Sequence, residues 1–259
     1  MELGLAGRAA IVTGASRGIG RAIAERLAAE GCWVLLVARD AAVLAEAATS
    51  IEGSVGFAAD VTAPGSAEAV VAACLEAFGR LDVLVNNAGG ATPARLEKLS
   101  DDDWLAAFQL NFFSAVRMSA AAVPVMREAG WGRLVHVASV SGREPDPMFA
   151  PYSAAKAALL NFSTSLSQAY AADGVLSSCV IPGITMTELV AANAEGAATR
   201  TGATADEVMA TMLERHRVAA GRFGESDEIA DAVAFLASER AAWITGATLE
   251  VDGGTLRGS

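Results

Sequence analysis

Short apolar runs alternate with amphipathic segments along most of the chain. The runs are rich in Val, Ile, Leu and Ala, a composition typical of strands that are buried on both faces of a parallel sheet. The segments between them carry apolar residues at the spacing of one helix face. This pattern predicts strands at residues 9–13, 33–38, 55–59, 81–85, 134–138, 175–181 and 248–251. Helices are predicted at residues 21–30, 41–51, 67–78, 101–129, 152–173 and 228–238.

The regular alternation of strands and helices indicates the fold class. It predicts an α/β protein with a Rossmann-like, doubly wound parallel sheet of about seven strands and helices on both faces. The 259 residues contain no internal repeat and no linker, so we expect a single domain over residues 1–259. In such sheets, ligands bind at the carboxyl ends of the strands.

Composition narrows the range of partners. A formal net charge of −11 disfavours nucleic acid and anionic membranes, because both require a basic surface. Cys32, Cys74 and Cys179 lack the spacing of a disulfide framework or a zinc site, so we expect no metal and a reducing compartment. The chain contains no run of membrane-spanning length, and its first residues lack the features of a secretion signal. We therefore expect a cytoplasmic protein.

A glycine-rich turn follows the first predicted strand. Its sequence is Gly14-Ala15-Ser16-Arg17-Gly18-Ile19-Gly20, and a helical pattern begins directly after it. A turn without bulky side chains lets backbone N–H groups and the positive end of a helix approach a diphosphate. A tight turn that binds nothing is the competing interpretation of the same glycines.

Tyr152 and Lys156 are four residues apart in a predicted helix. This spacing places them on the same face, where the Lys156 ammonium can lower the pKa of the Tyr152 phenol from its ordinary value near ~10. Such a phenol could exchange a proton with a ligand at neutral pH. For an isolated Tyr-x-x-x-Lys pair, however, a surface tyrosine beside a solvated lysine is the more common explanation.

The alternation of apolar runs and amphipathic segments is weak between residues 184 and 224. This segment is rich in alanine, and glycines interrupt its short helical pieces. We expect a substrate lid at 184–224, since mobile covers of this kind exclude water during catalysis. A solvated helical excursion that touches no ligand is the alternative. Met186, Leu189, Met209 and Met212 could line an apolar site, although methionine at helical spacing more often belongs to the core.

Several motifs together carry a family resemblance. They are Thr13-Gly14-x-x-x-Gly18-x-Gly20, Asn86-Asn87-Ala88-Gly89, Ser139, and Tyr152 with Lys156. Together they resemble the classical short-chain dehydrogenase/reductase family, in particular its 3-oxoacyl-(acyl-carrier-protein) reductase-like members. The resemblance extends from Gly7 to Gly254, and Asn111 falls where the family has a catalytic asparagine. Pro182-Gly183, with Thr187 shortly after, resembles the family's segment beside the nicotinamide carboxamide.

The resemblance implies a role for each of these residues. Tyr152 would be the general acid/base, Ser139 would hydrogen-bond the substrate oxygen, and Lys156 would bind the nicotinamide ribose. Asn111 would position a water, although from spacing alone it could also be a polar residue on a solvated helix face. The implied cofactor-binding residues are Gly14, Ser16, Arg17, Gly18, Ile19, Gly20, Arg39, Asp60, Val61, Asn87, Ala88, Gly89, Tyr152, Lys156, Pro182, Gly183 and Thr187.

Cofactor preference depends on the end of the second strand. A carboxylate there would accept a hydrogen bond from the 2′-hydroxyl of NAD(H) and repel the 2′-phosphate of NADP(H). This chain has Ala38 at that position, followed by Arg39, and Arg17 lies in the glycine turn. Two guanidiniums at a phosphate predict NADP(H), with NAD(H) as the alternative. Asp40, an acid near this position, would favour NAD(H). We expect its carboxylate to cap the next helix instead.

The resulting functional prediction is an NADP(H)-dependent oxidoreductase that reduces a carbonyl, a 3-oxoacyl thioester or related ketone, to a secondary alcohol. An NAD-dependent alcohol dehydrogenase for a sterol, sugar or other secondary alcohol is the first alternative. A dinucleotide-binding scaffold without turnover is the second, although the whole catalytic set is present. The resemblance also implies a homotetramer, supported by surplus apolar residues on the helices at 105–126 and 154–170.

Overall fold

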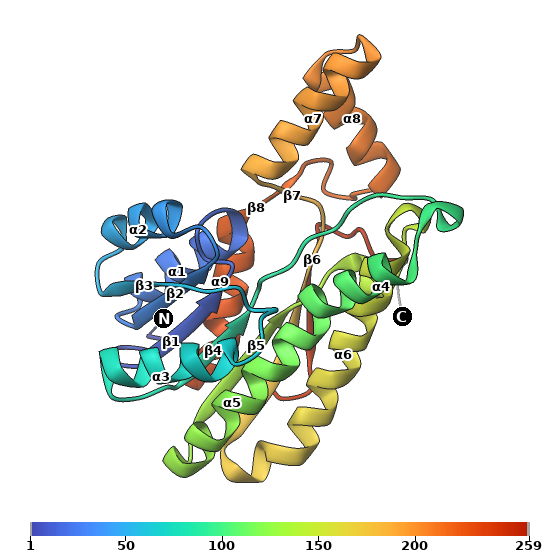
Figure 1. Cartoon of the computed structure of the whole chain (residues 1–259). Coiled ribbons are helices and arrows are strands. Elements are labelled where there is room, and N and C mark those ends of the chain that lie inside the picture. The colour runs from blue at the N-terminus through green and yellow to red at the C-terminus, as the bar shows by residue number, and fades with distance from the viewer. Residues whose placement is uncertain (1, 258–259) are drawn as a thin grey trace.

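The computed structural model describes residues 2–257, and its centre is a sheet of seven parallel strands (Figure 1). The strand order β3-β2-β1-β4-β5-β6-β9 changes direction between β1 and β4, as in a doubly wound Rossmann-like sheet. The strands are β1 (Ala9–Thr13), β2 (Trp33–Ala38), β3 (Ser54–Ala58), β4 (Val83–Asn86), β5 (Gly132–Val137), β6 (Val175–Pro182) and β9 (Thr248–Val251). Because these pairings are parallel, the carboxyl ends of the strands meet at one edge. The predicted fold class is confirmed.

Helices cover both faces of the sheet (Figure 1). One layer contains α1 (Gly18–Ala29), α2 (Ala41–Ser50) and α9 (Ser226–Ala237). The other layer contains α3 (Ser66–Phe78), α5 (Ser114–Ala129) and α6 (Ala150–Tyr170). Apart from the region before α5, the ends of these elements agree with the sequence prediction to within three residues. The hydrophobic pattern was sufficient here because each element buries one continuous apolar surface.

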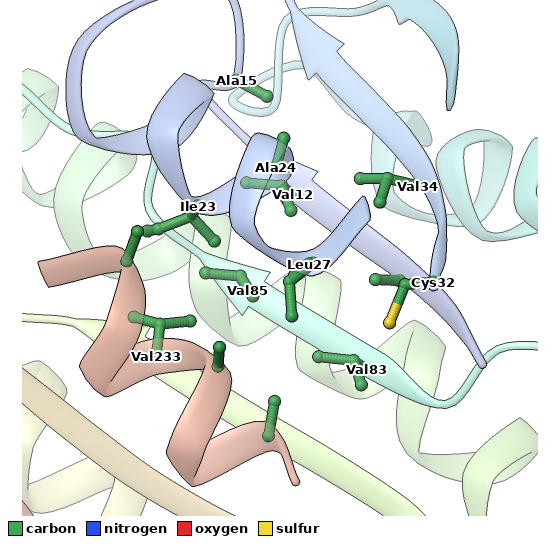
Figure 2. Close-up of a cluster of buried hydrophobic side chains, with 14 of the residues drawn as sticks. Val12, Ala15, Ile23, Ala24, Leu27, Cys32, Val34, Val83, Val85 and Val233 are labelled. Carbon is green, nitrogen blue, oxygen red and sulfur yellow. The ribbon is translucent and has the colours of Figure 1, made fainter. Parts of the chain in front are cut away.

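Successive residues on the central strands pack into opposite layers. Val12 and Val85 belong to the same buried cluster as Leu27 of α1 and Val233 of α9, and Figure 2 shows these four side chains together. The neighbouring Ile11 belongs to the cluster on the other face. Burial of one such side chain contributes about 1.5–3 kcal/mol to folding. This two-sided burial explains why the strands read as apolar runs, and why polar residues at their ends stand out.

The helical region predicted over residues 101–129 is not one α-helix. It consists of α4 (Asp101–Phe108), a π-helical segment (Gln109–Phe113) and α5. Asn111 lies buried inside the π segment, and its side-chain amide bonds both backbone groups of Gly90. A π segment is a wider turn within a helix and is frequent at functional sites. Helical periodicity cannot locate such a segment, because the apolar residues on either side keep their spacing.

Residues 184–224 form two regular helices instead of short interrupted pieces. A small sheet of β7 (Thr185–Met186) and β8 (Gly224–Glu225) leads into and out of α7 (Glu188–Thr201) and α8 (Ala205–His216). Thr187 caps the start of α7, and Thr204 forms a capping box with Glu207 at α8. Both helices project away from the large sheet at the top of Figure 1.

The three cysteines are buried free thiols. Burial raises the pKa of Cys32 and of Cys74 to about 12 and that of Cys179 to about 11. They therefore stay protonated and pack as small apolar groups. Among residues 2–257, no helix combines the length and apolar character that crossing a membrane requires.

A buried carboxylate joins the amino-terminal ends of β1 and β4. Asp82 is 2% exposed. Arg80 donates two hydrogen bonds to it (2.6 and 2.7 Å), Arg8 donates one (3.0 Å), and the backbone N–H of Ala9 donates another (2.8 Å). Burial alone would raise the pKa of Asp82, but the bonds from Arg80, Ala9 and Arg8 hold it below its ordinary value. Arg8 also stacks on Trp131, with its guanidinium carbon 3.8 Å from the ring centre.

Replacing Asp82 by Asn should lower the free energy of unfolding by about 1–3 kcal/mol at neutral pH, because the arginines lose their charged acceptor. The folded pKa of Asp82 lies below its unfolded value. This stability is therefore present above the unfolded pKa of about 3.9 and is lost as pH falls through the folded value. Urea denaturation of both proteins at several pH values should show their difference shrinking toward acidic pH.

Asp231→Asn is the matched control for this measurement. Asp231 pairs with Arg26 on the surface and its side chain is 67% exposed, so its loss should change stability by less than about 0.5 kcal/mol. Equal losses in the two variants, or an Asp82→Asn effect independent of pH, would contradict the stabilising role of the Asp82 network.

Candidate active site

Hydrogen bonds of the Thr13 and Asn87 side chains hold the carboxyl ends of β1 and β4 together. The Thr13 hydroxyl donates to the carbonyl oxygen of Val85 (3.3 Å). It accepts from the backbone N–H groups of Asn87 and Ala88 (both 3.0 Å). The Asn87 side-chain amide donates in turn to the carbonyl oxygen of Thr13 (2.9 Å). These bonds place the glycine turn beside the segment that follows β4.

The glycines of this turn are required by backbone conformation and by space. Gly14 and Gly18 have φ angles of +69° and +55°, a region that favours glycine. A Cβ atom on Gly20 would lie 2.2 Å from the carbonyl oxygen of Gly14 and 2.4 Å from the Asn87 amide nitrogen. Because α1 begins at Gly18, its free backbone N–H groups lie at the carboxyl edge of the sheet. The turn therefore has the backbone geometry of an anion cradle.

The end of β2 carries residues predicted to select the cofactor. Arg17 and Arg39 are exposed, and no ion pair among the described residues engages either guanidinium. Their convergence on one phosphate stays a prediction. Asp40 caps α2, where its carboxylate accepts from the backbone N–H groups of Ala42 (3.0 Å) and Val43 (3.2 Å). The capping role predicted for Asp40 is thus confirmed.

Asp60 and Val61 follow β3 at the same edge. The Asp60 carboxylate accepts from the backbone N–H of Thr62 (2.9 Å) and from its hydroxyl (2.7 Å). These two bonds, together with the charge of Arg39, hold the pKa of Asp60 below its ordinary value. Val61 is buried and belongs to the apolar cluster on the α3 face of the sheet. The Asp60 carboxylate is thus held in one orientation near the charge of Arg39.

Ser139 lies at the end of β5 in close contact with α6. It caps a short 3₁₀ turn, Val140–Gly142, and its hydroxyl accepts from the backbone N–H of Ser141 (3.2 Å). A Cβ atom on Gly142 would lie 3.0 Å from the backbone carbonyl carbon of Lys156. Glycine at this position therefore lets the Ser139 turn pack directly against the helix that carries Lys156.

Tyr152 and Lys156 lie one turn apart on α6. The Lys156 ammonium is 5.7 Å from the centre of the Tyr152 ring and donates to the carbonyl oxygen of Val137 (2.7 Å). Lys156 is 3% exposed, and burial lowers its pKa to about 8. Burial raises the pKa of Tyr152, and a hydrogen bond with Ser139 offsets part of that rise. The expected net fall of the Tyr152 pKa is therefore wrong for these protein groups, because desolvation of the phenolate dominates.

Asn111 ties the π segment to the loop after β4. Its side-chain amide accepts from the N–H of Gly90 (3.0 Å) and donates to the carbonyl oxygens of Gly90 and Ala107 (both 2.9 Å). A Cβ atom on Gly89 would lie 2.8 Å from the Asn111 side-chain oxygen and 3.5 Å from the Lys156 amine. Asn111, Gly89 and Lys156 therefore converge. At 2% exposure, Asn111 does not lie on a solvated face.

The end of β6 brings the remaining predicted residues to the same edge. Pro182 ends this strand, and a Cβ atom on Gly183 would lie 2.7 Å from the Cα atom of Asp252. Thr187 caps α7, and its methyl carbon would lie 3.4 Å from a Cβ atom on Gly18. The start of α7 therefore packs against the glycine turn.

A family model covers most of this chain. The model, described as short chain dehydrogenase, matches residues 8–198. The chain belongs to the short-chain dehydrogenase family. As a member of this family it is an oxidoreductase.

Two relatives of this short-chain dehydrogenase are similar over nearly their whole length. The 3-oxoacyl-[acyl-carrier-protein] reductase FabG of Escherichia coli (strain K12) is 41% identical over 250 residues, which cover 96% of this chain and 97% of that protein. The short-chain reductase protein NovJ of Streptomyces niveus is 37% identical over 249 residues, 95% of this chain and 92% of that protein.

Solved structures of short-chain dehydrogenases share the same backbone. The L-sorbose reductase of Gluconobacter frateurii, complexed with NADPH and L-sorbose, has a TM-score of 0.96 at 34% identity, with 100% of both chains covered. An actinorhodin polyketide ketoreductase with NADPH has a TM-score of 0.90 at 33% identity, covering 96% of this chain and 97% of that one.

The sequence did not reveal a buried polar cluster beneath the active site of this short-chain dehydrogenase. His136 on β5 accepts at Nδ1 from the Asn86 side chain (3.2 Å), which also lies 3.3 Å from the Ser119 hydroxyl. Burial, together with the charge of Lys156, lowers the pKa of His136 to about 3, so the imidazole is neutral. The available signal was a histidine within the otherwise apolar run at 134–138. Burial makes this histidine a neutral polar group inside the core.

Aromatic contacts behind this cluster were also missed. The ring centre of Phe112 in the π segment lies 5.9 Å from that of Phe162 on α6, edge to face. Phe162 in turn lies 6.0 Å from the His136 ring. Bulky residues next to Asn111 therefore fill the space between the π segment and α6, and they help to fix the distance from Asn111 to Lys156.

Proposed function

We propose that this protein is an NADPH-dependent reductase that converts a carbonyl, in a 3-oxoacyl thioester or related ketone, to a secondary alcohol. The observation that carries the proposal is the meeting of Ser139, Tyr152 and Lys156 at the carboxyl edge of the sheet. Similar proteins support it: one is a 3-oxoacyl-[acyl-carrier-protein] reductase, and a sorbose reductase and a ketoreductase have structures with NADPH.

Tyr152 would deliver the proton to the substrate oxygen. Its raised pKa keeps the phenol protonated at neutral pH, which suits an acid in the reductive direction. Ser139, which lies close to Tyr152, would turn its one hydroxyl proton to the same oxygen and stabilise the negative charge that develops on it. The two hydroxyls together would hold the carbonyl in one orientation.

Lys156 would supply positive charge next to the phenol. With a pKa of about 8, its ammonium is the main form at neutral pH. The bond to the Val137 carbonyl fixes this charge one turn from Tyr152. A fixed ammonium in a buried site favours the phenolate that proton transfer leaves behind, because charges interact strongly where water is excluded. Lys156 therefore assists the step without first ionising Tyr152.

The residues at this edge fit a dinucleotide. Glycines leave the backbone of the turn uncovered for a diphosphate, and a Cβ atom on Gly89 would lie 3.5 Å from the Lys156 amine. Bound NADPH would supply the hydride that reduces the carbonyl. Asp60 and Val61 would hold the adenine. Arg17 and Arg39 would hold the 2′-phosphate, and the residues beside the carboxamide would be Pro182, Gly183 and Thr187.

The α7–α8 pair is the lid in this proposal. Arg215 near the end of α8 forms an ion pair with Asp146 (2.5 Å). The other Asp146 oxygen accepts from the backbone N–H of Met148 (2.8 Å), in the loop that leads directly into α6. This ion pair links the lid to the segment that positions Tyr152. Closure over the substrate would exclude water from the site.

A sugar-like ketone is the second substrate class. The L-sorbose reductase backbone matches this chain with a TM-score of 0.96, against 0.90 for the actinorhodin ketoreductase. Because fold does not determine substrate, both classes enter the experiment below. NAD-dependent oxidation of a secondary alcohol is the alternative for cofactor and direction.

The homotetramer stays a prediction, as does a cytoplasmic location. Leu105 on α4 and Phe113 in the π segment are 58% and 38% exposed. Exposed apolar side chains on these neighbouring helical segments are what a face covered by a second subunit would present.

Tyr152→Phe tests the proposed reaction, with turnover followed by NADPH absorbance. The wild type should reduce 3-oxoacyl thioesters, or else ketoses such as L-sorbose. The variant should bind NADPH with unchanged affinity but lose about 10²–10⁴-fold in turnover, because only the transferable proton is removed. Near wild-type rates would rule out the role of Tyr152. A wild type that reduces no carbonyl with either cofactor would contradict the proposed function.

Arg39→Ala should lower kcat/KM with NADPH by about tenfold or more and leave the value with NADH nearly unchanged. The reason is that a charge-assisted bond to a phosphate contributes about 1.5–3 kcal/mol, and NADH has no 2′-phosphate. Arg127→Ala is the control, since Arg127 pairs with Asp173 at 2.6 Å on the surface. If the wild type prefers NADH, or if Arg39→Ala leaves the cofactor ratio unmoved, the NAD-linked alternative is favoured.

A further inference from the structure

Glu188 places a carboxylate beside the glycine turn. It is the first residue of α7, and a Cβ atom on Gly18 would lie 3.7 Å from its carboxylate oxygen Oε2. Both residues line an open hollow of about 490 Å³ between α1, α7 and α9. In Figure 1, β7 and the start of α7 lie above α1 and α9. The carboxylate thus lies close to the backbone N–H groups that begin α1.

Other charges lining the hollow do not balance Glu188. Arg21 is engaged by Glu25 at 2.9 Å, and Asp227 in the first turn of α9 adds another acid. The positive ends of α7 and α1 favour a negative charge at this position. A diphosphate at the glycine turn would interact with the same positive helix ends, mainly with that of α1.

We propose that Glu188 opposes the cofactor diphosphate and weakens the binding of NADPH and NADH by the same factor. This inference rests on the proposed dinucleotide function, because it takes the glycine turn as the diphosphate site. A carboxylate that lies next to that turn repels phosphate oxygens of the same charge. The repulsion is the same for both cofactors, since both contain the diphosphate. Cofactor release after turnover is correspondingly faster.

A purely structural role for Glu188 gives the opposite sign. As the first residue of α7, the carboxylate favours the helix N-terminus, and its loss would loosen the segment that carries Thr187. Cofactor binding would then weaken or stay the same. Removal of a repulsive charge instead tightens binding. The direction of the change therefore separates the two roles.

Glu188→Gln is the informative substitution, because it removes the charge and keeps the size of the side chain. NADPH and NADH are titrated separately by calorimetry, without a carbonyl substrate. The Kd for both should fall by about three- to tenfold at low salt, and the gain should shrink as ionic strength rises. Unchanged or weaker binding would overturn the proposal. Tighter binding of NADPH alone would do the same, since it would place Glu188 at the 2′-phosphate.

Glu195→Gln is the matched control, because both side chains are exposed and it removes the same charge two turns further along α7, away from the glycine turn. Its Kd values should match those of the wild type. An equal gain in this variant would mean that net charge, not position, causes the effect, and the proposal would be rejected. A wild type that binds neither cofactor would contradict the proposed function itself, an outcome distinct from a Glu188→Gln variant that binds no more tightly.

Discussion

The candidate site depends on a lysine ammonium buried between α6 and the end of β5. Lys156 is 3% exposed, and it donates to the carbonyl oxygen of Val137, the last residue of β5. A buried ammonium needs such a partner, because desolvation disfavours its charged form and is the main reason why its pKa falls to about 8. The bond therefore fixes α6 against the strand edge, and it fixes Tyr152 with it. Any movement of α6 that breaks the bond leaves the charge buried without a partner.

Close backbone approaches make this arrangement possible. Gly142 lets the Ser139 turn contact the backbone of Lys156, and Gly89 leaves room for the amide of Asn111. The Asn111 side chain makes its hydrogen bonds to backbone groups, and these bonds orient the π segment toward the loop after β4. Phe112 packs against Phe162 and supports the same geometry from behind. Hydrogen bonds, glycines and aromatic packing thus all help to fix the position of the Lys156 ammonium.

The sheet, its helices and the positions of the site residues could be predicted, because burial on two faces produces a strong sequence pattern and the motifs follow strand ends. Asp40 was correctly assigned to a helix cap for the same local reason. The π segment at Asn111 could not be located, since it depends on a long-range bond to Gly90. The Tyr152 pKa was predicted in the wrong direction because spacing shows a neighbouring charge but not the burial that opposes it. The roles of His136 and Glu188 could not be predicted, because they depend on contacts between segments that are distant in the sequence.

The pH dependence of single-turnover NADPH oxidation, with a saturating carbonyl substrate, tests the role of Lys156 most directly. The rate should be level near neutral pH and fall as pH rises through about 8, where Lys156 loses its proton. A Lys156→Met variant should be slow and should lack this step, because it has no charge to lose. A wild-type rate that stays level well above that pH, or a variant that keeps the wild-type rate and profile, would contradict the dependence of the site on this ammonium.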